Sequence, residues 1–233
     1  MNKIPTYIEG FDEVLDGGIP AGHVVLICGT PGTMKTSLSF SIMYENAKRE
    51  KLKGLYISFE ETYESLKGAM FELEMTDIDQ LEVYMLDIGR IRKEHPQEEL
   101  THNWLNVLTT YIQKRVEVDD FDIIVIDSLA ALHSLASLKN PRLELFHFIR
   151  FLKEIHSTVL LISEISHGST SLVANDEDFL VDGIIHLKMH EVGESDFQLR
   201  INCVKMRRTN HQRGWYRLMH GKKGFNTTPV ISE

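Results

Sequence analysis

Short apolar runs alternate with segments of helical periodicity through the first two thirds of the chain. Brief apolar runs are typical of buried strands, and apolar residues spaced three or four apart are typical of amphipathic helices. Their alternation predicts strand–helix units that build a mainly parallel sheet flanked by helices. We expect strands at 23–29, 55–59, 82–88, 121–127 and 158–162, and helices at 35–49, 62–73, from about 103 to 118, and at 141–156.

The pattern changes after residue 182. Three strand-like runs, within 183–189, 197–206 and 215–219, follow one another with turns and no helical segment between them. Such runs predict antiparallel strands at an edge of the sheet. Repeats, low-complexity tracts and linkers are absent from the sequence, so we expect an α/β fold in a single domain spanning 1–233.

Composition agrees with a folded protein, since 42% of the 233 residues are hydrophobic and 25% are charged. The sequence has no apolar run near the roughly 18 to 20 residues of a membrane helix. Its first residues lack the apolar core of a secretory signal. The two cysteines, Cys28 and Cys203, lie in apolar runs. A disulfide framework is not expected, and a cytoplasmic location fits best.

A glycine-rich loop joins the first apolar run to the first helical segment. It reads GTPGTMKT from Gly29 to Thr36. In a phosphate-binding loop, glycines let backbone N–H groups wrap a phosphate, a lysine contacts the outer phosphates, and a hydroxyl binds Mg²⁺. The start of the helix adds partial positive charge. Because Gly29, Gly32, Lys35 and Thr36 match, we expect a nucleotide with Mg²⁺ here.

Met34 departs from this pattern, which has glycine at that position. A residue with a side chain can still direct its N–H toward a phosphate if its backbone is helical and the side chain turns away. We favour a working loop on this basis. The alternative is a degenerate loop that binds nucleotide weakly or not at all.

Carboxylates follow two of the expected strands. Asp127 ends the run FDIIVID, where phosphate-loop proteins place the acid that directs Mg²⁺. Glu60 and Glu61 follow the run LYISF, at a strand end where parallel sheets bind ligands. One of the two could activate a water beside the γ-phosphate. The alternative is that one glutamate caps the helix that begins near Thr62.

The segment from Lys205 to Lys223 contains seven basic residues and no acidic residue. On a strand, Lys205 and Arg207 share a face and could contact one anion together, as an arginine finger does. Trp215 and Tyr216 among the basic residues permit nucleic-acid binding, and a solvated edge hairpin is the third possibility. Spacing does not separate these three. The basic residues are Lys205, Arg207, Arg208, Arg213, Arg217, Lys222 and Lys223.

Further motifs surround the phosphate loop in a fixed order. They are Ile8-Glu9-Gly10-Phe11-Asp12, Gly17-Gly18-Ile19-Pro20, Phe59-Glu60-Glu61-Thr62, Asp127-Ser128-Leu129, and Lys205-Met206-Arg207-Arg208-Thr209-Asn210-His211 with Gly214 after it. With the phosphate loop they cover nearly the whole chain, which resembles the KaiC-like ATPases of the RecA superfamily. The resemblance implies a RecA-like P-loop NTPase fold.

By this resemblance the protein binds ATP and Mg²⁺, hydrolyses ATP, and acts as a nucleotide-dependent switch. It also implies a homo-oligomer, often a hexameric ring, with ATP at subunit interfaces. Thr36 and Asp127 would direct the metal, and the catalytic residues would be Glu60, Glu61, Lys205 and Arg207, the last two reaching the adjoining subunit's nucleotide. The implied nucleotide-binding residues are Gly29, Thr30, Pro31, Gly32, Thr33, Met34, Lys35, Thr36, Ser37 and His211.

The clock members of this family phosphorylate themselves on Ser and Thr just before the strand that corresponds to GIIHL. Here Asn175–Val181 reads NDEDFLV, without a hydroxyl, so autokinase activity is not expected. A nucleotide-binding scaffold with little catalysis is one alternative function. A DNA-binding recombinase paralogue is another, but residues 163–182 contain five acidic residues and no Lys or Arg, which makes nucleic acid an unlikely partner.

Charge is unevenly distributed along the chain. The formal net charge is −9, although residues 205–223 contribute seven of the 25 Lys and Arg residues and no acid. Because the resemblance places nucleotide contacts in this segment, we expect it to form a local anion site on an acidic body. The identity of a protein partner is not indicated by the sequence.

Overall fold

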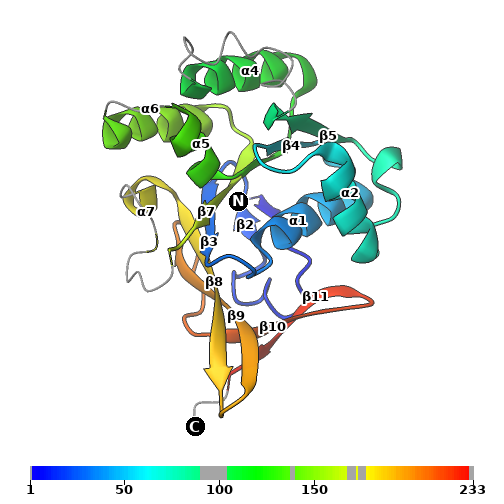
Figure 1. Cartoon of the computed structure of the whole chain (residues 1–233). Helices are drawn as coiled ribbons and strands as arrows, with labels where there is room; N and C mark the ends of the chain where they lie inside the picture. The colour runs from blue at the N-terminus through cyan, green and yellow to red at the C-terminus, as the bar shows by residue number, and fades with distance from the viewer. Residues whose placement is uncertain (1, 90–103, 137–139, 167–171, 173–176, 231–233) are drawn as a thin grey trace.

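One nine-stranded sheet organises the structure, a computed structural model that describes residues 2–89, 104–136, 140–166, 172 and 177–230 (Figure 1). The strand order is β11-β10-β9-β8-β3-β7-β6-β4-β5. Its strands are β3 Val24–Gly29, β4 Gly54–Ser58, β5 Val83–Asp87, β6 Ile123–Asp127, β7 Thr158–Glu164, β8 Gly183–Val192, β9 Asp196–Met206, β10 Tyr216–Gly221 and β11 Gly224–Pro229. The helices are α1 Lys35–Glu50, α2 Tyr63–Glu72, α4 Trp104–Asp119, α5 Leu129–Ala136, α6 Pro141–Glu154 and α7 Glu177–Leu180, with a 3₁₀ turn at Ile78–Gln80.

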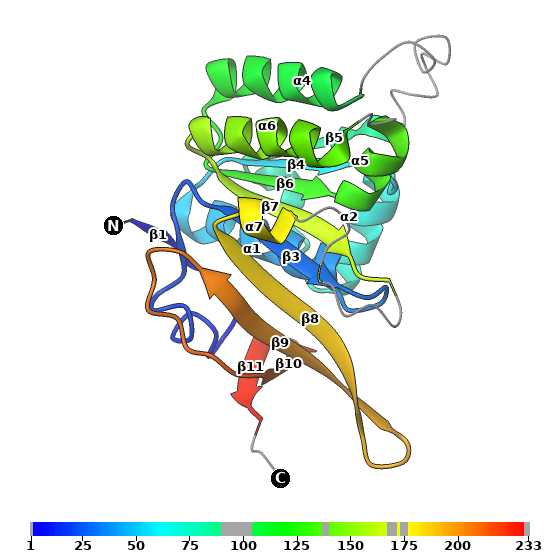
Figure 2. The same ribbon diagram turned by 90° about the vertical axis from the view of Figure 1, so that its left-hand side faces the viewer.

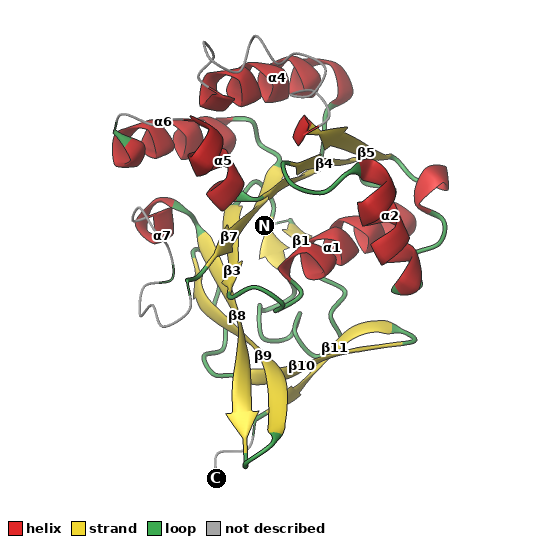
Figure 3. Cartoon of the chain, viewed as in Figure 1, coloured by secondary structure: helices red, strands yellow, loops and turns green. Residues whose placement is uncertain are grey.

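The strand directions confirm the predicted fold class. Strands β3 to β8 pair in parallel, whereas β8, β9, β10 and β11 pair antiparallel in sequence order. The connections between the parallel strands carry the helices, which is typical of an α/β sheet. Figure 3 separates the helical layers from the sheet and from the antiparallel strands at one side. The carboxyl ends of β3, β7, β6 and β4 therefore lie along one edge.

Helices cover the parallel strands on both faces. On one face α1 and α2 pack with the N-terminal segment over a core that includes Phe11, Phe40 and Tyr56. On the other face α4, α5 and α6 form a second core with Trp104 and Phe148. The central parallel strands β3, β4, β6 and β7 are consequently buried on both sides, which accounts for their nearly continuous apolar sequences, whereas the edge strand β5 is partly exposed.

The expected helices and strands agree with the structure to within a few residues at their ends. Thr62 caps α2, because its side chain accepts a hydrogen bond from the backbone N–H of Ser65. The polar stretch predicted at 92–103 lies outside the described residues, as do Asn175 and Asp176.

Several elements were not predicted. Helix α5 is a mostly apolar segment of eight residues, LAALHSLA, which is too short for its apolar run to be told apart from a buried strand. Strand β11 reads GFNTTP and is specified by its pairing with β10. A two-stranded sheet of β1 Lys3–Ile4 and β2 Ile19–Pro20 was also missed, since two residues carry no period.

Two further expectations concern the chain as a whole. Both cysteines are free and buried, as the sequence predicts. Within the ranges described, none of the helices combines the length and the apolar character needed to cross a membrane.

Candidate nucleotide site

The loop between β3 and α1 has the backbone that a phosphate cradle requires. Gly32 has a φ of 82°, and a Cβ built there would meet no atom within 4 Å, so the backbone at this point faces open space. Gly29 is packed instead, because a Cβ there would lie 2.5 Å from the carbonyl oxygen of Leu187. Inside the loop, the Thr33 hydroxyl donates a hydrogen bond of 2.8 Å to the carbonyl of Thr30. Glycine is thus required at both positions, for different reasons.

Met34 adopts a left-handed backbone, with φ 62° and ψ 28°, directly before the first residue of α1. The expectation that a non-glycine residue is tolerated here through an ordinary helical backbone is therefore wrong, because the backbone is left-handed. Left-handed residues are typical of the turns whose N–H groups form anion-binding concavities. The loop therefore keeps a glycine-like conformation at a residue with a partly buried apolar side chain.

Lys35 is held inside the loop by other groups of the protein. Its Nζ donates to the Thr30 carbonyl at 3.0 Å and lies 3.8 Å from a carboxylate oxygen of Glu164, and only 7% of its side chain is exposed. Burial lowers the pKa of Lys35, while the carboxylates of Glu164 and Asp127 oppose that shift. An incoming phosphate would replace interactions that already hold this cation in place.

Asp127 meets Thr36 at the end of β6. The Thr36 hydroxyl donates to Asp127 Oδ2 at 2.8 Å, and the hydroxyl of Tyr56 donates to the same oxygen at 2.6 Å. Burial raises the pKa of Asp127, and these two hydrogen bonds counteract that effect. The sequence identified Thr36 and Asp127 but missed Tyr56, a fully buried residue of β4 that reads as core.

These oxygen donors fit Mg²⁺ in the way expected beside a nucleotide. In the described part of the chain, no three His, Cys, Asp or Glu residues are grouped to hold a metal by themselves. Magnesium in such sites is held by one or two protein oxygens, with phosphates and waters filling the other positions. A hydroxyl and a carboxylate side by side at a phosphate loop match that requirement.

The two glutamates expected to be catalytic, Glu60 and Glu61, lie in different surroundings. Glu60 borders a cavity of about 390 Å³ beside Glu164, Ala130 and Ala131, at the carboxyl ends of β4 and β7. Burial raises the pKa of Glu60, and the carboxylates of Glu164 and Asp127 add to the rise. A carboxylate of raised pKa near a phosphate site suits proton abstraction from water.

Glu61 points to the start of α2 instead. Its carboxylate accepts a hydrogen bond from the hydroxyl of Ser65, and its backbone exchanges hydrogen bonds with the side chain of Ser58. The possibility that a glutamate caps this helix is partly correct, since Thr62 is the cap and Glu61 supports the first turn. Of the two, Glu60 is the one placed among the other acidic groups.

Glu164 is a second site residue, besides Tyr56, that was not predicted from the sequence. It is the last residue of β7, between the ends of β3 and β6 in the sheet. The rule that selected Asp127, a carboxylate at the end of an apolar strand, would have selected Glu164 as well.

Lys205 and Arg207 contact one segment together, but they lie away from this loop. Lys205 Nζ donates to the carbonyls of Asp178 and Val181 at 2.8 and 2.9 Å. Arg207 donates to the Asp182 carboxylate at 3.1 Å, and its own carbonyl is 3.2 Å from the ring of His23, at the amino end of β3. Strand β9 ends at Met206, so the expected strand geometry is wrong at Arg207.

The phosphate loop is at the other end of β3. Through β8, Lys205 is level with Leu26, three residues or about 10 Å before Gly29, and Arg207 lies farther back beside His23. Both side chains are held by the segment around α7 and not by the loop of their own chain. Figure 2 shows the end of β9 toward the same side of the sheet as the N-terminus, the loop after β3 on the opposite side, and α7 between them in this view.

His211 also lies in the connection from β9 to β10. The backbone N–H of the next residue, Gln212, donates to the carbonyl of Val14, which ties this connection to the N-terminal segment. Both ring nitrogens of His211 are buried without a hydrogen-bond partner in the described chain. The connection lies on the Lys205 side of the sheet in Figure 2.

The seven basic residues of 205–223 do not form one local anion site. Lys205 and Arg207 contact the segment around α7, Arg217 lies on β10, and Lys222 and Lys223 are exposed in the turn before β11. One shared site was expected because these residues are close together in the sequence. The antiparallel strands separate them.

Comparison with known proteins identifies the family. A family profile described as "ATPase: KaiC" matches residues 4–229. The circadian clock oscillator protein KaiC 1 of Synechocystis sp. is 29% identical over 99% of this chain and 45% of its own length. The KaiC protein of Synechococcus elongatus is 27% identical over 98% of this chain and 44% of its own length. The chain therefore spans less than half of these curated relatives.

A solved structure shares the fold. The crystal structure of a KaiC-like protein from the archaeon Pyrococcus horikoshii OT3 matches with a TM-score of 0.82 at 23% identity, over 98% of this chain and 99% of that one. The chain thus has the fold of this KaiC-like protein. This chain belongs to the KaiC family of ATPases.

Proposed function

We propose that this member of the KaiC family binds ATP with Mg²⁺ at residues 29–37 and hydrolyses it with Glu60 as the general base. The observation that carries the proposal is the convergence of Lys35, the Thr36–Asp127 pair and Glu60 at the ends of adjacent strands. Each group has a chemical task in phosphoryl transfer to water.

The backbone of the loop would bind the phosphates, and Lys35 would exchange its contact with Glu164 for a phosphate oxygen. Thr36 and Asp127 would hold the metal, with Tyr56 fixing the carboxylate. When bound, Mg²⁺ offsets the negative charge of the phosphates. Glu60 would orient the attacking water and accept its proton, since its raised pKa favours proton uptake.

Lys205, Arg207 and His211 would act on the nucleotide of a neighbouring copy. The Lys205 and Arg207 side chains are held by the segment around α7 and not by the loop of their own chain, and a head-to-tail arrangement brings one end of the sheet against the other end in the next subunit. Such contacts close into a ring, and a hexamer is the assembly we propose. The nucleotide would then complete each interface, so its hydrolysis would change subunit packing and act as a switch.

Other functions receive less support. A scaffold with little catalysis would follow if Met34 impaired the loop, yet Met34 preserves the left-handed backbone. A DNA-binding recombinase lacks basic residues in 163–182. Autokinase activity is not expected, because 175–181 offers no hydroxyl, and the buried free cysteines agree with a cytoplasmic location. We treat 1–233 as one ATPase domain.

Phosphate release by Glu60→Gln tests the proposal, with Glu72→Gln, an exposed residue of α2, as the matched control. Loss of a general base lowers turnover by a factor of roughly 10² to 10⁴. We expect Glu60→Gln to lose turnover in that range and to retain ATP binding in calorimetry. Equal turnover in Glu60→Gln and wild type would refute the assignment of Glu60.

A further inference from the structure

The antiparallel strands carry a hydrophobic core on only one of their faces. Leu187, Ile201, Leu218 and Phe225 all belong to the cluster that packs with α1 and the N-terminal segment. In the part of the chain that the structure describes, the second cluster, under α4 to α6, receives no residue from β9, β10 or β11. The opposite face of these strands is therefore left without helical cover, as Figures 1 and 2 show.

Three cations lie in register across this uncovered face. Lys188 on β8 is the direct partner of Arg200 on β9, and Arg200 is the direct partner of Arg217 on β10. Side chains at directly opposed positions share a face with Cβ atoms about 5 Å apart, and like charges so placed destabilise a sheet. We call Lys188, Arg200 and Arg217 the basic row.

The basic row is not neutralised within the chain. Across the described ranges, no carboxylate lies within 4 Å of any of its three cations, whereas Lys153 and Arg207 both pair with Asp182. Among the described residues, the Nε of Arg200 is buried without a hydrogen-bond partner, and its guanidinium donates to the Gln198 side chain alone, at 3.4 Å. Burial lowers the pKa of Lys188, and the charge of Arg200 lowers it further.

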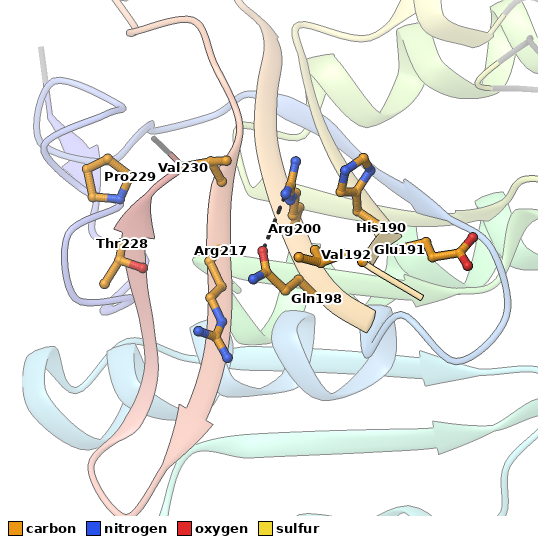
Figure 4. A pocket seen from close by; sticks show the side chains of 10 residues that line it. His190, Glu191, Val192, Gln198, Arg200, Arg217, Thr228, Pro229 and Val230 are labelled. Atoms are coloured by element: carbon orange, nitrogen blue, oxygen red, sulfur yellow. Dashed lines mark hydrogen bonds between the residues drawn. The ribbon is translucent and has the colours of Figure 1, made fainter. Parts of the chain in front are cut away.

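A cavity of about 460 Å³ opens beside the row (Figure 4). Arg200, Arg217, His190 and Gln198 line it, together with Thr228, and among the described residues Glu191 supplies the one carboxylate of the lining. In Figure 4 the guanidinium groups of Arg200 and Arg217 are turned apart, as expected for like charges. At the other end of the row, Lys188 Nζ lies 3.8 Å from the ring centre of Trp215, which fixes this cation against an aromatic surface.

We propose that the basic row is a second anion site, which binds a compact ligand carrying two or more phosphate groups. The guanidinium fork matches phosphate oxygens in pairs, and two arginines on neighbouring strands offer two such forks. A bound anion would remove the repulsion between the cations and occupy the cavity. The acidic rim at Glu191 and the net charge of −9 oppose a long polyanion such as DNA, so the cavity favours a small ligand.

Calorimetric titration with tripolyphosphate tests this site, with excess Mg-ADP present in every sample to occupy the phosphate loop. The variants are Arg200→Gln/Arg217→Gln, and Arg217→Gln alone, in which the altered residue is exposed and no core contact changes. Lys222→Gln/Lys223→Gln is the matched control, because it removes the same charge from the exposed turn between β10 and β11. ATP and a single-stranded oligonucleotide are titrated in parallel.

We expect the double variant to bind tripolyphosphate at least tenfold more weakly than wild type, Arg217→Gln several-fold more weakly, and the control within twofold. Equal binding of ATP and tripolyphosphate under these conditions would show that the phosphate chain is what the row recognises. An equal loss in the control would overturn the site, since general electrostatics would then explain binding. Absence of saturable binding by wild type, or binding of the oligonucleotide alone, would also overturn it. None of these outcomes depends on hydrolysis at Glu60.

Discussion

The left-handed backbone of Met34 makes a prediction whose sign depends on the conformation alone. Met34→Gly and Met34→Ala both remove the side chain, so the loss of its partial burial is common to the two variants. The two variants differ in whether a Cβ atom remains at position 34. Alanine keeps a Cβ in the left-handed region, at a cost of about 1 to 2 kcal/mol, and glycine has no such cost.

Glycine brings an opposing penalty, because its unfolded chain is freer than that of alanine by about 0.4 to 1 kcal/mol. The difference favours glycine by about 1 kcal/mol at this position. In a right-handed helix the order is reversed, since alanine is then more stable than glycine by about 1 kcal/mol. Lys114, exposed within α4, supplies the control pair Lys114→Ala and Lys114→Gly.

Thermal or urea unfolding of the four variants without nucleotide measures both differences. A difference of 1 kcal/mol shifts the melting temperature by about 2 to 4 °C for a chain of this size. We expect Met34→Gly to melt above Met34→Ala, and Lys114→Ala to melt above Lys114→Gly. If Met34→Ala were the more stable of its pair, the left-handed assignment and the argument built on it would be wrong.

Three other residues of the site give separate predictions. Tyr56→Phe removes a hydrogen-bond donor to Asp127, at a cost of about 1 kcal/mol, so we expect Mg²⁺-dependent ATP binding about fivefold weaker in calorimetry. Tyr84→Phe is the control and should bind as wild type does. An unchanged Mg²⁺ dependence in Tyr56→Phe would contradict this role of Tyr56. Glu164→Gln removes the negative charge that pairs with Lys35. Because Glu164 is 43% exposed, this ion pair contributes at most about 1 kcal/mol, so the affinity for ATP should rise by up to about fivefold. Weaker ATP binding would show that Glu164 contributes to the site in another way. Burial raises the pKa of Glu60, so ionisation of this carboxyl destabilises the folded state at pH values above about 4.3, the pKa of a glutamate in the unfolded chain. Glu60→Gln should therefore have a higher melting temperature than wild type at pH 7, and the difference should vanish below about pH 4. A difference that is constant at all pH values would exclude ionisation as its cause.

The parallel sheet and most of the phosphate site were predictable from local pattern. The apolar runs marked the strands, and the sequence GTPGTMKT with Asp127 marked the loop that we propose binds phosphate. These features are local in sequence, and the rule that parallel strands share a carboxyl edge brings them together. Helix α5 and strand β11 escaped prediction because tertiary contacts specify them.

The residues that were missed are those whose neighbours are distant in sequence. Tyr56 reads as a core residue of β4, and only the packing of β4 beside β6 brings its hydroxyl to Asp127. Conversely, Lys205 and Arg217 seemed to belong together because they are near in sequence. The register of β9 and β10 instead pairs Arg217 with Arg200, which the basic segment does not include.

The central claim is that ATP is hydrolysed at Glu60 with Lys205 and Arg207 supplied by a neighbouring copy. Mixing two inactive variants tests it directly: Glu60→Gln, and Lys205→Gln/Arg207→Gln. In a random head-to-tail assembly, about a quarter of the interfaces would combine an intact Glu60 from one variant with an intact basic pair from the other. We expect phosphate release by the mixture to recover to about a quarter of the wild-type rate by this counting. A mixture no more active than the mean of its two components would contradict the account.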